Sequence, residues 1–353
     1  MQAVMEYMST RWDFQQPNLV WFPDSKSGPT KHLTKRPQNA SKTGTKLRHN
    51  NSLYADDAAF IFLSYKGLKG GTKLIKESFE KFGLQVHLGT RHNNKPDEKS
   101  KTEAMYFPPR SKRLNRHKDG PPTPVLDYLP HDSFDIEGTN RFVSFSPTFK
   151  YLGSNLTMDH ADEFDIDSRI TAATKAFGAL GRVFKNRNIS KTIRVQLYLA
   201  IPINILLWGC ASWALSAQGM RKLQTFHNDC ARKLCGLTQY HHMTYHISMD
   251  NILNTRLNLL SIDKLIEMRQ LRFLIKVANL PTTRLTRQII NSVAIPEAGI
   301  TLTGGRHLST RGSYRDVLEK AELVTKGKGA PPKKKNGSLN CNNQTLANIS
   351  KRN

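Results

Sequence analysis

Apolar residues recur at alternating intervals of four and three along much of the second half of the chain, a spacing that places side chains on one face of an α-helix. The clearest run consists of Ile166, Ile170, Ala173, Phe177, Leu180 and Phe184. Another begins at Ala217, with inward positions Met220, Leu223, Phe226, Cys230 and Leu234. Ser190 is placed to cap a further helix, and another is expected over about 262–278. The pattern therefore predicts that residues 162–280 are nearly all α-helical.

The pattern is different earlier in the chain, where apolar and aromatic residues surround a polar pair. The stretch Leu53-Tyr54-Ala55-Asp56-Asp57-Ala58-Ala59-Phe60-Ile61 predicts a strand, a tight turn and a second strand. Behind this hairpin, the spacing of Leu68, Ile75, Phe79 and Phe82 predicts an amphipathic helix over 68–82. Gly83 is placed to end that helix, which we expect to pack on one face of the hairpin.

Three segments lack such a pattern. Residues 23–50 are rich in Lys, Asn, Ser, Thr and Gly, a composition typical of a flexible basic loop. Residues 88–147 hold Pro, Asn, Lys and Arg with only short apolar islands, which indicates a long insertion between core elements. Beyond residue 280, periodicity fades and basic residues outnumber acidic ones, which predicts a disordered basic tail.

The charge balance of the chain favours nucleic acid as a partner. The chain has 53 Lys and Arg against 28 Asp and Glu, a formal net charge of +25. Such an excess repels itself unless a polyanion neutralises it. No apolar run approaches the roughly 18 residues that a membrane-spanning helix needs, so we expect no membrane partner. Four cysteines do not make a disulfide framework, which favours an intracellular protein.

Asp56 and Asp57 are the residues most suited to chemistry. Adjacent carboxylates at a hairpin tip repel each other unless a cation lies between them. Mg²⁺ prefers such oxygen ligands and leaves coordination positions for phosphates and water. Taken alone, however, a solvated Asp-Asp turn is the simpler explanation.

Further motifs follow the hairpin in a fixed order and change that balance. They are Phe82-Gly83-Leu84-Gln85-Val86, Lys101-Thr102-Glu103 and Phe149-Lys150-Tyr151-Leu152-Gly153. Together with Tyr54-Ala55-Asp56-Asp57, they resemble the palm of reverse transcriptases encoded by non-LTR (LINE-type) retrotransposons. Segments 207–213 and 223–230 are similar to the thumb helices of that family. The resemblance covers about residues 51–280, with 88–147 departing from it.

The resemblance implies a role for each matching residue. Asp56 and Asp57 would be catalytic metal ligands, Asp57 the weaker one, for two Mg²⁺ ions or for Mn²⁺ in their place. Tyr54 would lie against the primer end, and Lys101 near the incoming triphosphate. Tyr151, Leu152 and Gly153 would form the primer-grip hairpin, where glycine allows close approach to nucleic acid. Core packing is an equal alternative for Tyr151 and Leu152.

Part of the family's site has no counterpart in the 353 residues. The family has a first palm motif with another metal-binding Asp, followed by a Gln-Gly-type motif. Upstream of the hairpin the only aspartates are Asp13 and Asp24, neither in a strand-like pattern. Residues 1–8 resemble the helix that follows the Gln-Gly-type motif. The sequence therefore indicates a truncated enzyme that does not polymerise alone and would need an upstream fragment.

These observations predict an α+β chain with four parts. They are a remnant palm helix and basic flexible loop (1–50), a partial palm (51–155), a helical thumb-like region (156–280) and a basic, largely disordered tail (281–353). The expected partners are an RNA template and a DNA primer, bound through phosphate contacts. Lys333-Lys334-Lys335 has the composition of a nuclear-import patch, so a nuclear location is favoured and a cytoplasmic one is the alternative.

Other functions remain open at this point. One is a non-catalytic nucleic-acid-binding protein, another a decayed retroelement fragment, and a third a group II intron maturase-like protein, which shares the Asp-Asp palm. The residue types of Cys230, Cys235, His242 and His246 also suit zinc. Cys230 lies on an apolar helix face, however, so a buried free cysteine is the better explanation and no zinc site is expected.

Overall fold

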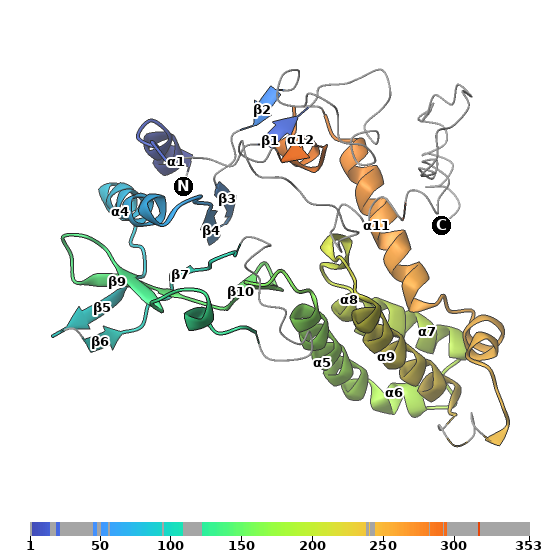
Figure 1. The fold of residues 1–353 in the computed structure, drawn as a ribbon. Helices are drawn as coiled ribbons and strands as arrows, with labels where there is room; N and C mark the ends of the chain where they lie inside the picture. The colour runs from blue at the N-terminus through green and yellow to red at the C-terminus, as the bar shows by residue number, and fades with distance from the viewer. Residues whose placement is uncertain are drawn as a thin grey trace, which may run out of the picture.

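The computed structural model describes residues 2–14, 19–21, 45–47, 51–55, 57–93, 95–108, 122–237, 240, 244–281, 283–291, 293–294 and 317. Their fold is α+β, as the sequence predicted, with small and mostly antiparallel sheets. In Figure 1, helices α1 and α4 lie near the small sheets, while α5 to α9 gather into a bundle from which α11 extends. Within the described residues, no helix combines the length and apolar character needed to cross a membrane.

The hairpin around the Asp-Asp pair is present, which confirms the prediction for this segment. Strands β3 (Asn51–Tyr54) and β4 (Asp57–Phe60) pair antiparallel, with Tyr54 opposite Asp57. Ala55 begins the turn with a φ of 53°. Asp56 lies outside the described part of the chain.

Helix α4 (Tyr65–Lys81) follows, with Ser64 accepting a hydrogen bond from the Gly67 amide at its start. Gly83 ends it with a φ of 74°, as expected. Ile75 and Phe79 are buried against α1 (Gln2–Ser9) and the partly buried Phe60 and Phe62 of the hairpin side. A Cβ at Gly71 would lie only 2.1 Å from the Phe62 ring, so glycine is required for this close packing. Phe82, expected to point inward, is instead exposed, and its ring packs at 72° to the ring of Tyr7.

Residues 88–147, expected to be a long insertion with only short apolar islands, contain more regular structure than the sequence indicated. They form a five-stranded sheet of order β6-β5-β9-β7, with β8 also paired to β9. The strands are β5 (Gly89–His92), β6 (Lys95–Glu98), β7 (Glu103–Ala104), β8 (Ser133–Asp135) and β9 (Arg141–Phe145), with a short helix η2 (Val125–Asp127) before β8. The apolar islands Phe134, Ile136 and Val143 make its core, against which Leu68 of α4 packs. The basic stretch 110–118 lies outside the described residues.

The predicted helical region is confirmed. Its elements are α5 (Glu163–Ala179), α6 (Gly181–Lys185), α7 (Lys191–Ala200), α8 (Pro202–Leu206), η3 (Cys210–Ser212), α9 (Ala217–Cys235), the π-helix η4 (Asn251–Leu257) and α11 (Ile262–Ala278). The residues predicted to face inward from α5 and α9 are all buried in one core or packed against it. The same core contains Tyr198, Trp213 and Ile252. Ser190 caps α7 by accepting from the Ile193 amide at 3.3 Å.

A further small sheet joins segments far apart in sequence. Strand β1 (Leu19–Trp21) pairs antiparallel with both β2 (Thr45–Leu47) and β12 (Val293–Ala294), which follows α12 (Leu285–Asn291). Strand β2 lies within the segment expected to be a basic flexible loop, and α12 and β12 lie within the tail expected to be largely disordered. Most residues of both segments lie outside the described part of the chain.

Candidate nucleic-acid and metal site

The β3–β4 hairpin presents polar and aromatic side chains to solvent at its tip. Asp57 is the first residue of β4 and is exposed, and Tyr54 opposite it is 63% exposed. An exposed carboxylate with a second one adjacent in sequence offers the oxygen donors that Mg²⁺ prefers. The residue types of Asp56 and Asp57 therefore suit a divalent cation, and Asp57 is the one of the two that the structure describes.

A second hairpin lies beside the first. Strands β10 (Thr148–Tyr151) and β11 (Ser154–Thr157) pair antiparallel around a two-residue turn. Both turn residues have positive φ, 48° for Leu152 and 86° for Gly153. Positive φ at both central positions is typical of the turns that match strand twist, and glycine meets it without strain. Leu152 does not, since a left-handed non-glycine residue costs about 1–3 kcal/mol.

Tyr151 connects the two hairpins. Its hydroxyl donates a hydrogen bond to Ser52 Oγ on β3, with an O···O distance of 3.2 Å. Its ring is half-buried and stacks near Phe149, with centroids 6.2 Å apart. Leu152 is 41% exposed, so core packing does not explain that residue. The structure thus brings the Tyr151 hydroxyl next to the strand that leads to Tyr54, and Leu152 and Gly153 follow Tyr151 in the turn.

The turn of the second hairpin is held by the helical region. Trp208 Nε1 donates to the Leu152 carbonyl at 3.2 Å, and Arg169 of α5 donates to the Gly153 carbonyl. A Cβ at Gly153 would lie 3.2 Å from Trp208 Nε1, which leaves little room for any larger residue. Trp208 itself is 55% exposed, so its indole flanks the turn at the surface.

Asp165 reinforces this connection from inside. Its buried carboxylate accepts from the Asn155 amide of β11 at 2.9 Å and from Trp213 Nε1 at 3.1 Å. It also lies 3.5 Å from Nε of Arg169. Sequence reasoning missed Asp165, Arg169 and Trp208 as positioning residues. The available signal was the acidic Asp165 directly beside Ile166 in the apolar stripe of α5.

Asp162 adds a titratable group at the same junction. Its Oδ2 accepts from the Ala214 amide at 2.6 Å. Burial raises the pKa of this carboxyl to about 6, opposed by the Ala214 hydrogen bond and helped by the nearby carboxylates of Glu163 and Asp165. The junction between hairpin and helices is therefore sensitive to mildly acidic pH.

Lys101 is not brought to this site by any described contact. It is exposed in the bend between β6 and β7, and no hydrogen bond or ion pair among the described residues joins it to either hairpin. The position beside an incoming triphosphate that the resemblance implied thus stays a prediction. Within the described ranges, no group of three or more His, Cys, Asp or Glu side chains is placed to hold a metal ion.

The cysteine and histidine set has a different character. Cys230 is buried in the helical core, and burial raises the pKa of its thiol to about 12. A zinc ligand must be a thiolate, which this environment disfavours. His227 on the same helix is also buried, bonded to Tyr198 Oη at 2.9 Å and to the Leu260 carbonyl at 3.0 Å. Burial lowers its pKa to about 4, which keeps the ring neutral. His242 lies outside the described residues.

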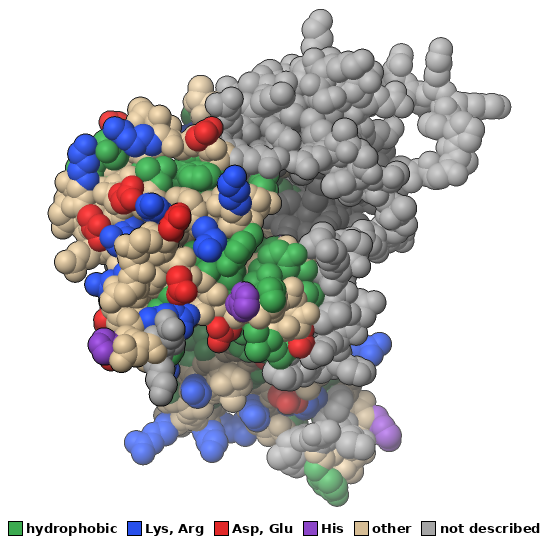
Figure 2. Space-filling model, turned by 60° about the vertical axis from the view of Figure 1, so that its left-hand side comes forward, with side chains coloured by type: hydrophobic (Ala, Val, Ile, Leu, Met, Phe, Trp, Pro, Cys, Tyr) green, Lys and Arg blue, Asp and Glu red, His purple; other side chains and the backbone are tan. Residues whose placement is uncertain are grey.

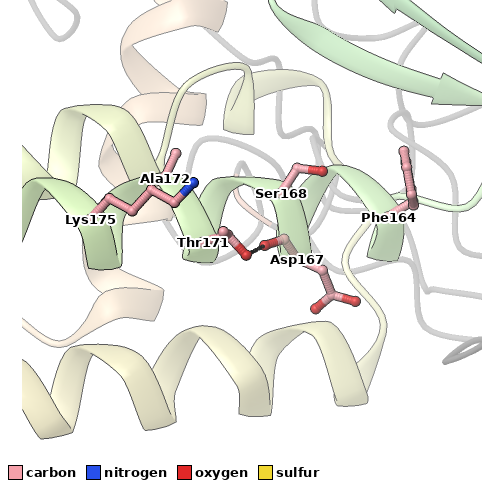
Figure 3. A pocket seen from close by; sticks show the side chains of 6 residues that line it. All are labelled: Phe164, Asp167, Ser168, Thr171, Ala172 and Lys175. Carbon is pink, nitrogen blue, oxygen red and sulfur yellow. Dashed lines mark hydrogen bonds between the residues drawn. The ribbon is translucent and has the colours of Figure 1, made fainter.

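A groove of about 440 Å³ runs along α5 (Figure 3). Its lining residues are Phe164, Asp167, Ser168, Thr171, Ala172 and Lys175. Asp167 also pairs with Lys222 of α9 at 2.9 Å, and Thr171 donates to the Asp167 carbonyl. The groove is lined by two hydroxyl groups and by the Asp167 carboxylate, whose charge is balanced by Lys222. Its lining residues do not include the group of several titratable side chains that catalysis needs.

Comparisons with known proteins add no relative. No protein-family model matches this chain, and neither curated proteins nor solved structures give a significant match. Function is therefore inferred from the ordered motifs and from the geometry of the two hairpins.

Proposed function

We propose that this chain is the palm and thumb portion of a retrotransposon-type reverse transcriptase, an RNA-directed DNA polymerase. The observation that supports the proposal best is the hydrogen bond between Tyr151 and Ser52. It joins the Asp-Asp hairpin to the Tyr-Leu-Gly hairpin, two motifs separated by nearly a hundred residues. A solvated Asp-Asp turn gives no reason for that juxtaposition.

The chemistry proposed for the first hairpin is metal-assisted nucleotidyl transfer. Bound divalent ions, about 3.5–4 Å apart in two-metal sites, stabilise the attacking 3′-hydroxyl and the leaving pyrophosphate. Asp57 and Asp56 would hold them from the hairpin tip. Tyr54, exposed opposite Asp57, would lie against the last primer nucleotide.

The second hairpin would hold the primer strand. Leu152 is exposed, and Gly153 has no side chain, so the backbone of a nucleic-acid strand could approach it closely. Trp208 and Arg169 fix the turn from behind, so its position depends on the helical region. The net charge of +25 would then supply sequence-independent affinity for phosphates.

Two adjacent carboxylates cannot satisfy the oxygen ligands of two ions, because each ion prefers six. We therefore propose that polymerisation needs a carboxylate supplied by an additional segment. The test is primer extension on an RNA template with Mg²⁺, with and without a palm segment that carries the family's first Asp motif. Background signal alone and extension in the mixture support the proposal.

The matched variants are Asp57→Asn at the tip and Asp97→Asn on β6, which is also exposed. Extension in the mixture should fall at least tenfold for Asp57→Asn and stay unchanged for Asp97→Asn. Extension by the chain alone that Asp57→Asn abolishes would mean that a carboxylate within these residues, such as Asp13 or Asp24, completes the site.

A non-catalytic nucleic-acid-binding protein is the second candidate. The observation that favours it is the excess of 53 Lys and Arg over 28 acidic residues, which needs no catalytic group. In that case the chain would bind primer–template with a strong salt dependence. No mixture would extend the primer, and Asp57→Asn would change nothing.

A further inference from the structure

Four lysines of α4 lie on one side of the helix. They are Lys66, Lys69, Lys73 and Lys76. At 3.6 residues per turn, their spacings of three, four and three place them within an arc of about 80°. Lys66, Lys69 and Lys73 are exposed, while Lys76 pairs with Glu80 at 2.8 Å. We call this set the α4 lysine stripe.

The stripe points away from the hairpin on which α4 packs. Ile75 is buried against α1 and the β3–β4 side, and it follows Lys66 by nine residues. Nine residues make about two and a half turns, so Lys66 lies on the opposite side of the helix. Figure 2 turns the side that carries α1 and α4 forward, where Lys and Arg side chains lie on the described surface with Asp and Glu side chains interspersed among them. The stripe is therefore a surface separate from the hairpin tip.

Repulsion among Lys66, Lys69 and Lys73 opposes formation of the helix that carries them, whereas Lys76 is balanced by Glu80. Lysines three and four apart repel one another on a helix surface. The first turn of α4 has no acidic residue, and positive charge there opposes the helix dipole. Within the described residues, Lys66, Lys69 and Lys73 form no salt bridge. A bound anion would remove all of these penalties together.

The shape of the stripe decides which polyanion fits. Lys66 to Lys76 covers about 15 Å of helix, the length of several successive phosphates. The apolar face of α4 is already covered by α1 and the hairpin, so none remains to enter a lipid bilayer. Tyr65 is 51% exposed beside the stripe, with Lys69 Nζ 5.7 Å from its ring centroid. An exposed aromatic ring among lysines is suited to a base stacked beside a phosphate chain.

We propose that the α4 lysine stripe and Tyr65 bind a single strand of nucleic acid, outside the site at the hairpin tips. The phosphates lie along Lys66, Lys69 and Lys73, and one base stacks on the exposed part of the Tyr65 ring, which packs nearly perpendicular to Phe134. This inference does not rest on polymerase activity, because it needs only the charge and geometry of α4.

The test measures binding of labelled oligo(U) to the full chain by fluorescence anisotropy across a salt titration. The variant Lys66→Gln/Lys69→Gln/Lys73→Gln is compared with Lys185→Gln/Lys191→Gln/Lys264→Gln, three exposed lysines of the helical region. Glutamine keeps helix propensity, and both variants lose the same charge. The stripe variant should reduce the slope of log affinity against log salt by about 2, because each single-strand phosphate contact contributes about 0.7. The control should change it far less, and equal effects of the two would overturn the proposal.

A second measurement tests the single-strand assignment. Tyr65→Leu keeps an apolar side chain against Phe134 but removes the stacking ring, and it should weaken oligo(U) binding about fivefold or more. Binding of a blunt duplex should not respond to it. The proposal is wrong if the stripe variant weakens duplex binding as strongly as oligo(U) binding, and if Tyr65→Leu changes the affinity for neither ligand. In that case the stripe binds the backbone of a duplex.

Discussion

The helical region and the hairpin region are stabilised in different ways. The helical region, residues 163–278, has one continuous core in which Ile166, Leu223 and Ile252 are fully buried. The β3–β4 hairpin is a two-stranded sheet in which Leu53 and Tyr54 remain exposed. Two strands alone are marginally stable in water, so the hairpins depend on their neighbours. The residues proposed for chemistry therefore lie on two-stranded hairpins. Helix α4 and the helical region hold these hairpins in place.

The largest expected effect comes from truncating the same residue type in each region. Leu223→Ala removes a fully buried side chain and should lower the free energy of unfolding by about 2–5 kcal/mol. Leu53→Ala changes a side chain that is 37% exposed and should cost about 0.5 kcal/mol or less. Urea denaturation followed by circular dichroism measures both. Equal losses would contradict the proposed difference between the regions.

Asp162, at the junction of the two regions, should make stability depend on pH. Its folded pKa of about 6 lies above the ordinary 3.8, so the folded state holds a proton that the unfolded state has lost between these values. Stability is therefore highest below about pH 4 for this group and declines as pH rises through about 6. Asp162→Asn should remove that decline and raise stability near pH 7 by about 1–2 kcal/mol.

Thermal unfolding of both proteins from pH 4 to pH 8 measures this difference. Asn can still accept from the Ala214 amide, so the hydrogen bond remains. A variant that loses stability near pH 7 would show that the charged form of Asp162 is favoured at this junction.

Gly153 tests how tightly the helical region holds the second hairpin. Gly153→Ala adds a Cβ at a φ of 86° and 3.2 Å from Trp208, and it should destabilise the protein by about 1–2 kcal/mol. Gly178→Ala is the control, because nothing lies within 4 Å of its Cβ and it is inside α5. The control should stabilise by about 0.5–1 kcal/mol. Denaturant midpoints for the two variants check the opposite signs.

The smallest expected effect concerns the bond between the hairpins. Tyr151→Phe removes the hydroxyl that donates to Ser52 and should cost about 0.5–1 kcal/mol. Ser52→Ala alone should cost a similar amount, and the double variant little more than either. A double-mutant cycle on unfolding free energies measures this coupling. Additive losses would mean that the two hairpins are held together by other contacts.

Local patterns predicted the elements whose own sequence determines them. The helices of residues 162–280 and α4 follow from apolar spacing, and the β3–β4 hairpin from strands on either side of a turn. The sheet in 88–147 was missed because β5 pairs with β9, some fifty residues away, and each strand is too short to show alternation. The pairing of Leu19 with Ala294 is likewise invisible to any local pattern.

The candidate site was predicted only in part for a related reason. Tyr151, Leu152 and Gly153 were recognisable as a motif, and the turn geometry agrees with it. The groups that hold this turn bind its backbone carbonyls, which no sequence pattern reveals. Arg169 and Trp208 could equally have been surface residues of helices until their partners were known.

The β10–β11 turn has few available backbone acceptors because of Trp208 and Arg169. Its two carbonyl oxygens already accept hydrogen bonds from Trp208 and Arg169. Carbonyl oxygens are the groups of a turn that attract cations, whereas amide N–H groups attract anions. The positive charge of Arg169 is balanced by the buried Asp165 carboxylate, which lies 3.5 Å from its Nε. A cation that approaches Leu152 and Gly153 therefore meets two carbonyl oxygens that are already hydrogen-bonded to the helical region.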